Sequence, residues 1–193
     1  MNIILVMGPQ GSGKSTQARL LSEYLGMQFM SVGELLRSYA KDNFGPIVDQ
    51  LRKTMNQGEL VDHDVTQMVI SLFLLEHPTE IGYVVDGYPR SVEDYREIEK
   101  LFNKTVDLCL VLTLDDTVIW ERIAKRQLTE HRKDETKDAV ERRLHIYRTR
   151  TQKAVEALQK DGVPVVFVDG SGSIDEIQSM LQEKSTSYVK ISN

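Results

Sequence analysis

The feature that most constrains this chain is a glycine-rich turn near its start, placed between an apolar run and a helical pattern. Residues 2–7 form an apolar run rich in branched side chains, which is typical of a strand buried on both faces of a parallel sheet. Residues 8–16 then read Gly-Pro-Gln-Gly-Ser-Gly-Lys-Ser-Thr, and a helical pattern continues to about Leu25. This is the pattern G-x-x-x-x-G-K-[ST] in its expected strand–loop–helix context. The sequence therefore predicts a phosphate-binding loop, or P-loop.

The residue types of this loop suit the phosphates of a nucleoside triphosphate. Glycines let backbone N–H groups turn inward around a β-phosphate, and the start of the following helix adds unpaired N–H donors and a favourable dipole. Lys14 can bridge the β- and γ-phosphates, and Ser15 or Thr16 offers a hydroxyl to Mg²⁺.

Four further apolar runs predict strands, and helical patterns separate them. The runs lie at residues 28–30, 83–86, 107–114 and 163–168, and helices are expected at 33–40, 46–55, 62–76, 115–126, 135–160 and 173–184. This alternation predicts an α/β protein of the three-layer P-loop NTPase fold, with a five-stranded parallel sheet flanked by helices in one domain spanning 1–193.

Three residues fall at the predicted C-terminal ends of strands: Gly8, Asp86 and Asp169. Ligands of such sheets bind beyond those ends, so we expect the site there. The charged run 93–100 is interpreted as the solvated face of a helix, and the polar tail from Ser185 is expected to fray.

Composition narrows the possible partners. Lys and Arg number 24 and Asp and Glu number 29, which gives a net charge of −5, so general binding to nucleic acid or to a membrane surface is not expected. The single cysteine, Cys109, lies in an apolar run and is interpreted as a buried, inert thiol. No apolar run approaches the roughly 18 residues of a membrane span. We expect a cytoplasmic protein, and a monomer because no extra interface segment is evident.

Three segments beyond the loop indicate a second substrate. Residues 31–37 read Ser-Val-Gly-Glu-Leu-Leu-Arg, residues 86–90 read Asp-Gly-Tyr-Pro-Arg, and residues 122–143 carry a series of arginines. Together with the loop, and in the same order over nearly the whole chain, these segments resemble the nucleoside monophosphate kinases, most closely the adenylate kinases with a short lid. The Asp-Gly-Tyr-Pro-Arg block is much more specific than the loop alone.

This resemblance implies direct transfer of the γ-phosphoryl group of ATP to a nucleoside monophosphate, with two diphosphates as products. Basic side chains would neutralise the transferred group: Lys14, Arg90, Arg126, Arg132 and Arg143. The ATP side would comprise Gly11, Ser12, Gly13, Lys14, Ser15, Thr16, Arg122, Arg126 and Gly170. The acceptor side would comprise Val32, Arg37, Glu59, Leu60, Val61, Gly87, Arg90, Asp94, Arg132 and Arg143. Ser15 and, through water, Asp86 would hold Mg²⁺, and no zinc is expected because the chain has one cysteine.

The chain also departs from the family pattern. The expected lid, residues 127–134, is very short, so a small helical segment at 30–61 would bind the acceptor and share the closure. Val32 and Asp94 stand where adenylate kinases usually carry threonine and glutamine near the acceptor base. A carboxylate accepts hydrogen bonds but does not donate them, and this leaves UMP, CMP or GMP as alternatives to AMP. A different P-loop kinase that acts on another small molecule is a further alternative, but the 86–90 block and Arg37 argue against it. A nucleotide-binding module without turnover is also disfavoured, because all the charged groups needed for catalysis are present.

Overall fold

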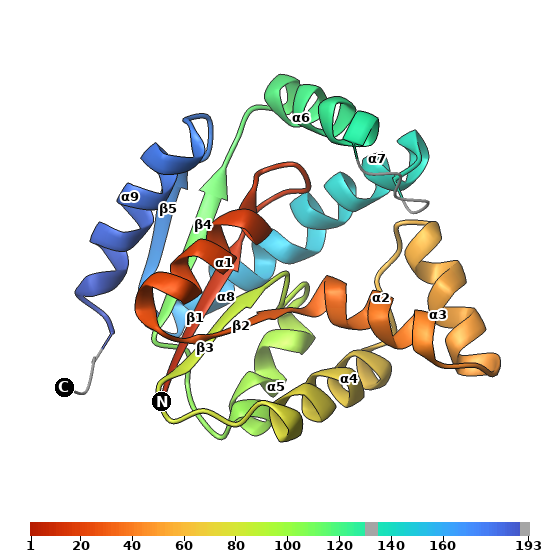
Figure 1. Cartoon of the computed structure of the whole chain (residues 1–193), viewed down its shortest axis with the longest axis horizontal. Coiled ribbons are helices and arrows are strands. Elements are labelled where there is room, and N and C mark those ends of the chain that lie inside the picture. Colours follow the sequence, from red (N-terminus) through yellow and green to blue (C-terminus); the bar gives the residue numbers. More distant parts are fainter. Residues whose placement is uncertain (130–134, 190–193) are drawn as a thin grey trace.

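The computed structural model describes residues 1–129 and 135–189. In this part of the chain a single parallel sheet has the strand order β2-β3-β1-β4-β5 (Figure 1). The strands are β1 (Asn2–Met7), β2 (Gln28–Ser31), β3 (Gly82–Asp86), β4 (Leu108–Thr113) and β5 (Val165–Asp169). The predicted five-stranded parallel sheet is confirmed.

Helices cover both faces of the sheet, which makes three layers. On one face lie α1 (Lys14–Leu25) and α9 (Ile174–Thr186); on the other lie α4 (His63–Glu76), α5 (Val92–Phe102) and α8 (Gln152–Lys160). The alternation of side chains along β1 explains this arrangement, since Ile4 and Val6 pack toward α1 and α9 while Ile3 and Leu5 pack toward α5 and α8. All four side chains are fully buried.

Four more helices lie around the C-terminal ends of the strands (Figure 1). They are α2 (Val32–Asp42), α3 (Pro46–Asn56), α6 (Asp116–Thr129) and α7 (Lys137–Ile146). The pair α2 and α3 falls within the expected 30–61 segment and projects beyond the edge strand β2. The end of this segment meets α7, because a Cβ atom on Gly58 would lie only 2.3 Å from the carbonyl oxygen of Ala139.

The structure differs from the predicted helix at 135–160. A π-helical turn, η1 (Tyr147–Thr151), separates α7 from α8. No residue pattern signals such a turn, which depends on tertiary contacts: Thr151 Oγ1 donates to the carbonyl of Arg90, 61 residues away. A π-helical turn inside a helix often marks a functional site.

The ends of two other predicted segments also change. Residues 127–129 of the expected lid belong to α6, and residues 130–134 lie outside the described residues. The expectation of a frayed tail from Ser185 is wrong for its first part, because Ser185 is fully buried within α9 and Val189 is also buried. Residues 190–193 of this tail lie outside the described residues. By contrast, the predicted caps at Asp62 and Ser173 are confirmed by hydrogen bonds from backbone N–H groups. Among the described helices, none combines the length and the apolarity that crossing a membrane requires.

Candidate active site

The phosphate loop connects β1 directly to α1. Its first glycine, Gly8, has a φ of +151°, and a Cβ atom there would lie 2.9 Å from the carbonyl of Leu112; the tight approach of the backbone therefore requires glycine. Because α1 begins at Lys14, the backbone N–H groups at the helix start, which lack partners within the helix, lie at the end of the loop and can donate to a phosphate. The side chain of Lys14 folds back and donates to the carbonyl of Pro9 over 3.2 Å.

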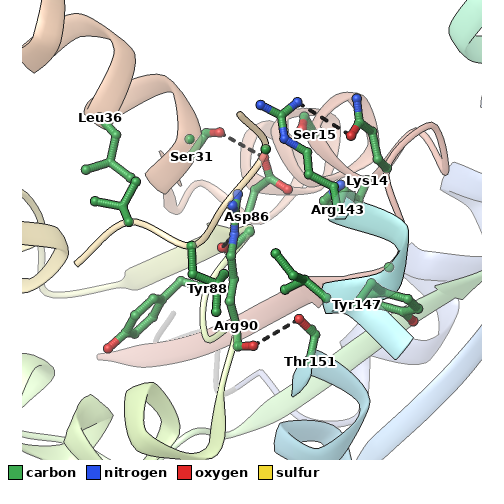
Figure 2. Close-up of a pocket in the computed structure, with 18 of the residues that line it drawn as sticks. Lys14, Ser15, Ser31, Leu36, Asp86, Tyr88, Arg90, Arg143, Tyr147 and Thr151 are labelled. Carbon is green, nitrogen blue, oxygen red and sulfur yellow. Dashed lines mark hydrogen bonds between the residues drawn. The ribbon is translucent and has the colours of Figure 1, made fainter. Parts of the chain in front are cut away.

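Beyond the loop is a depression that we call the central cleft, in which cationic side chains converge (Figure 2). Its cations come from five different elements or connections, and they are Lys14, Arg37, Arg90, Arg126 and Arg143. Burial lowers the pKa of Lys14 to about 8, an effect that Asp86 opposes and the neighbouring arginines reinforce. The pKa of Arg90 is also lowered, first by burial and then by Arg143. So many partly buried like charges indicate a site for a polyanion, which would relieve their repulsion.

Asp86 is the acidic member of the cleft and ends β3 beside β1 and β2. Ser31 Oγ donates to its Oδ2 atom over 2.8 Å, whereas within residues 1–129 and 135–189 the buried Oδ1 atom finds no hydrogen-bond partner. Ser15 lines the same cleft. A carboxylate and a hydroxyl fit Mg²⁺, which keeps several waters and takes few protein ligands. No group of three or more His, Cys, Asp or Glu side chains suited to a metal occurs in the described part of the chain.

Two arginines approach each other on the α2 side of the cleft. A Cβ atom on Gly33 would lie 3.5 Å from Arg37 Nη1 and 3.7 Å from Arg90 Nη2, so both guanidinium groups lie beside the start of α2. Arg90 Nε donates to the carbonyl of Gly87 over 2.9 Å, and its own carbonyl accepts from Thr151 Oγ1 over 3.0 Å. The turn after β3 and the η1 turn thus fix Arg90 from two sides. Two guanidinium forks in this arrangement suit a phosphate dianion.

On the opposite side, a buried carboxylate organises two more arginines. Glu135 is only 4% exposed and accepts from Arg126 through both of its carboxylate oxygens. Gln10 of the phosphate loop also donates to Glu135, over 3.1 Å. Arg143 contacts Gln10 over 3.5 Å and donates to the carbonyl of Met55 over 3.0 Å. These contacts connect the loop, α6, α7 and the end of α3 around one cleft.

Sequence reasoning assigned no role to Glu135, although it named the segment around it. The available signal was its place between arginines expected to converge, since a buried carboxylate is the usual partner of clustered guanidinium groups. Arg132, the fifth basic residue of the expected clamp, lies outside the described residues.

The residues expected on the ATP side meet next to the loop. Arg122 lies within 3.4 Å of the carbonyl of Ser12 and also reaches the carbonyls of Ser171 and Gly172. Gly170 donates to the carbonyl of Thr113 over 2.8 Å, and a Cβ atom on it would lie 3.5 Å from the carbonyl of Ser12. Arg122 and Gly170 therefore flank Ser12, while Thr16 is exposed.

A second depression, which we call the side cavity, adjoins the central cleft. Six residues line both: Leu36, Leu60, Val61, Gly87, Tyr88 and Arg90. The side cavity also includes Val32, His63 and Asp94. Glu59 lines only the central cleft and forms an ion pair with Arg142 over 2.9 Å.

The interpretation of residues 93–100 as the solvated face of a helix is wrong for Asp94. Its side chain is 14% exposed, and Oδ2 accepts from the backbone N–H of Arg90 over 2.9 Å. Its other oxygen, Oδ1, lies 2.9 Å from His63 Nδ1. Sequence reasoning missed His63, as well as Tyr147 and Thr151 in the cleft, because their contacts come from the tertiary fold.

Comparison with known proteins agrees with this geometry. A family model described as adenylate kinase matches residues 6–163, which is most of the chain. The chain belongs to the adenylate kinase family. The resemblance that rested on the phosphate loop, residues 31–37 and the Asp-Gly-Tyr-Pro-Arg block is thereby confirmed.

Curated members of this family align along nearly their whole length. An adenylate kinase of Nocardia farcinica is 37% identical over 179 residues, which is 90% of this chain and 93% of that protein. An adenylate kinase of Renibacterium salmoninarum is 33% identical over 180 residues, 92% of each protein. One of Xylella fastidiosa is 33% identical over 181 residues, 92% of this chain and 96% of that protein.

Proposed function

We propose that the protein catalyses the reversible transfer of the γ-phosphoryl group of ATP to AMP, which yields two molecules of ADP. The observation that carries the proposal is the central cleft, where Lys14, Arg90, Arg126 and Arg143 converge around the buried Asp86 at a phosphate loop. Membership of the adenylate kinase family favours AMP over UMP, CMP and GMP as the acceptor.

On the donor side, the loop from Gly11 to Thr16 would surround the β- and γ-phosphates, with Lys14 between them. Arg122 and Gly170 would contact the adenosine part, which their position beside Ser12 supports. Ser15 and Asp86 would hold Mg²⁺, which when bound neutralises charge on the β- and γ-phosphates.

On the acceptor side, Arg37 and Arg90 would hold the phosphate of AMP. An oxygen of that phosphate attacks the γ-phosphorus, the bond to the β-phosphate oxygen breaks, and its electron pair leaves with ADP. The charge on the transferred phosphoryl group is neutralised by Lys14, Arg126 and Arg143. No side chain forms a bond to phosphorus, so no covalent intermediate is expected.

Closure would depend on two parts of the chain. Residues 30–61 would fold over the acceptor, and the contact between Gly58 and Ala139 supports an approach of this segment to α7. The short lid 127–134, with Arg132, would cover the donor. Such closure excludes water, which would otherwise accept the phosphoryl group.

The test is a coupled assay of ATP·Mg²⁺ with AMP, UMP, CMP, GMP and dGMP in parallel. We expect ADP from AMP with a kcat/KM well above that of the other acceptors. The absence of diphosphate from every acceptor would overturn the kinase assignment, whereas a strong preference for GMP would overturn only the choice of AMP.

A further inference from the structure

The inference concerns the side cavity, and it rests on the proposed function. Its walls next to Arg90 are apolar, formed by Val32, Leu36, Leu60 and Val61. If Arg90 holds the acceptor phosphate, the adjoining apolar cavity is the place for the acceptor base, since flat aromatic bases bind between apolar walls. Selection between bases then depends on the polar side chains between α4 and α5.

A chain of hydrogen bonds crosses this polar end. Gln67 Nε2 lies 2.6 Å from His63 Nε2, and His63 Nδ1 lies 2.9 Å from Asp94 Oδ1. Because a carboxylate only accepts, the hydrogen of His63 is on Nδ1 and donates to Asp94. His63 Nε2 then accepts from the amide of Gln67. The imidazole is held from both sides and in turn fixes one oxygen of Asp94.

The other contacts of Asp94 complete its orientation. Oδ2 accepts from the N–H of Arg90 over 2.9 Å, and the carbonyl of Asp94 accepts from Tyr88 Oη over 3.0 Å. The neighbouring Thr66 donates its hydroxyl proton to the carbonyl of Asp62. Asp94 and Thr66, both of which line the cavity, therefore present acceptors to it. A base that places an amino group here gains a hydrogen bond, and a base without a donor loses one.

We propose that His63 is a specificity-determining residue, which positions Asp94 so that the side cavity selects an acceptor base carrying an exocyclic amino group. The 6-amino group of adenine donates to the free lone pair of Asp94. His63 acts through Asp94 and not on the transferred phosphoryl group, so it governs the choice and affinity of the acceptor.

The experiment compares AMP with purine riboside 5′-monophosphate, which is AMP without its 6-amino group. We expect the unaltered protein to prefer AMP by about 10- to 100-fold in kcat/KM, the range of a hydrogen bond to a charged group. In His63→Ala this preference falls to about threefold or less and the KM for AMP rises, while kcat and the KM for ATP stay unchanged. His63→Asn retains the preference, because its amide nitrogen can replace Nδ1 as the donor to Asp94.

One control and one further variant keep the test decisive. His145→Ala removes an exposed histidine of α7 and should leave the preference unchanged. Asp94→Asn should also weaken the preference for the amino group, because an amide both donates and accepts. This second variant tests the inference even if His63→Ala does not fold.

The inference, but not the proposed function, would be overturned if His63→Ala kept the full preference for AMP. The same conclusion would follow if His63→Ala lost kcat equally with both acceptors and also changed the KM for ATP. No ADP from AMP with the unaltered protein would instead overturn the proposed function.

Discussion

The central cleft and the side cavity share one wall but are built for different tasks. The cleft gathers cations from the phosphate loop, α2, α6, α7 and the turn after β3, with Asp86 buried among them. The cavity has apolar walls and the hydrogen-bonded pair of His63 and Asp94 at one end. On the proposed function, the first arrangement would bind phosphate, which every acceptor carries, and the second would distinguish bases.

This difference leads to a general expectation. Substitutions in the cleft should lower the rate for every acceptor by the same factor, because they act on the transferred group. Substitutions around the cavity or in the acceptor segment should change KM for the acceptor and leave ATP unaffected. Kinetics with two acceptors test this separation of catalytic rate from acceptor binding.

The largest effect is expected from Arg90→Ala, because Arg90 is half-buried and borders both depressions. We expect kcat/KM to fall about 10³-fold, the scale for loss of a charged group that stabilises a transition state in a closed site. The loss should be the same for AMP and for purine riboside monophosphate. The backbone contacts of Arg90 with Asp94 and Thr151 remain in the variant, so the turn should keep its shape.

The matched control is Arg96→Ala, which removes an exposed arginine paired with Asp161. Its kcat/KM should remain within about twofold of the unaltered protein, as expected for a surface ion pair. An unchanged rate in Arg90→Ala would show that Arg90 does not contact the reacting groups.

A smaller loss is expected from Glu135→Gln, which keeps the size of the side chain but removes the charge that orients Arg126. Because misplacement of a positioning group by about 1 Å can cost about 10²-fold, we expect kcat to fall about 10- to 100-fold with either acceptor. Steady-state kinetics would measure this, with Glu141→Gln, an exposed residue of the adjoining helix α7, as control. A change confined to KM for AMP would assign Glu135 to the acceptor site instead.

The sequence predicted the cleft better than the cavity for a physical reason. The phosphate loop is a local motif, in which strand, glycines and helix start follow one another within residues 2–25, and Asp86 is found from the end of a strand. Contacts between distant side chains have no such signal. The pair of His63 and Asp94 spans 31 residues, and the contact of Gln10 with Glu135 spans 125. The η1 turn was missed for the same reason.

The pH dependence of ATP binding should come next in size. With its pKa lowered to about 8 by burial, Lys14 loses its charge in the free protein as pH rises above 8, whereas bound phosphates would raise that pKa again. Affinity for ATP, measured by calorimetry in EDTA, should therefore be highest near pH 7.5 and fall about tenfold or more by pH 9.5. AMP affinity should change much less over this range, since the arginines around its phosphate stay charged. A parallel decline for both nucleotides would contradict the separation.

The smallest effect is expected from Gly58→Ala, which tests the contact of the acceptor segment with α7. The added Cβ atom would lie 2.3 Å from the carbonyl of Ala139, so the segment must move away from α7. We expect the KM for AMP to rise about threefold to fivefold, with the KM for ATP unchanged, since only the acceptor side is displaced. Gly26→Ala is the matched control: its φ of +64° is close to the +72° of Gly58, but a Cβ atom there would meet nothing within 4 Å. Both variants carry the cost of a left-handed alanine, about 1–2 kcal/mol, so only the clash distinguishes them. An equal rise in KM for AMP in both would mean that backbone strain, and not the position of the segment, controls acceptor binding.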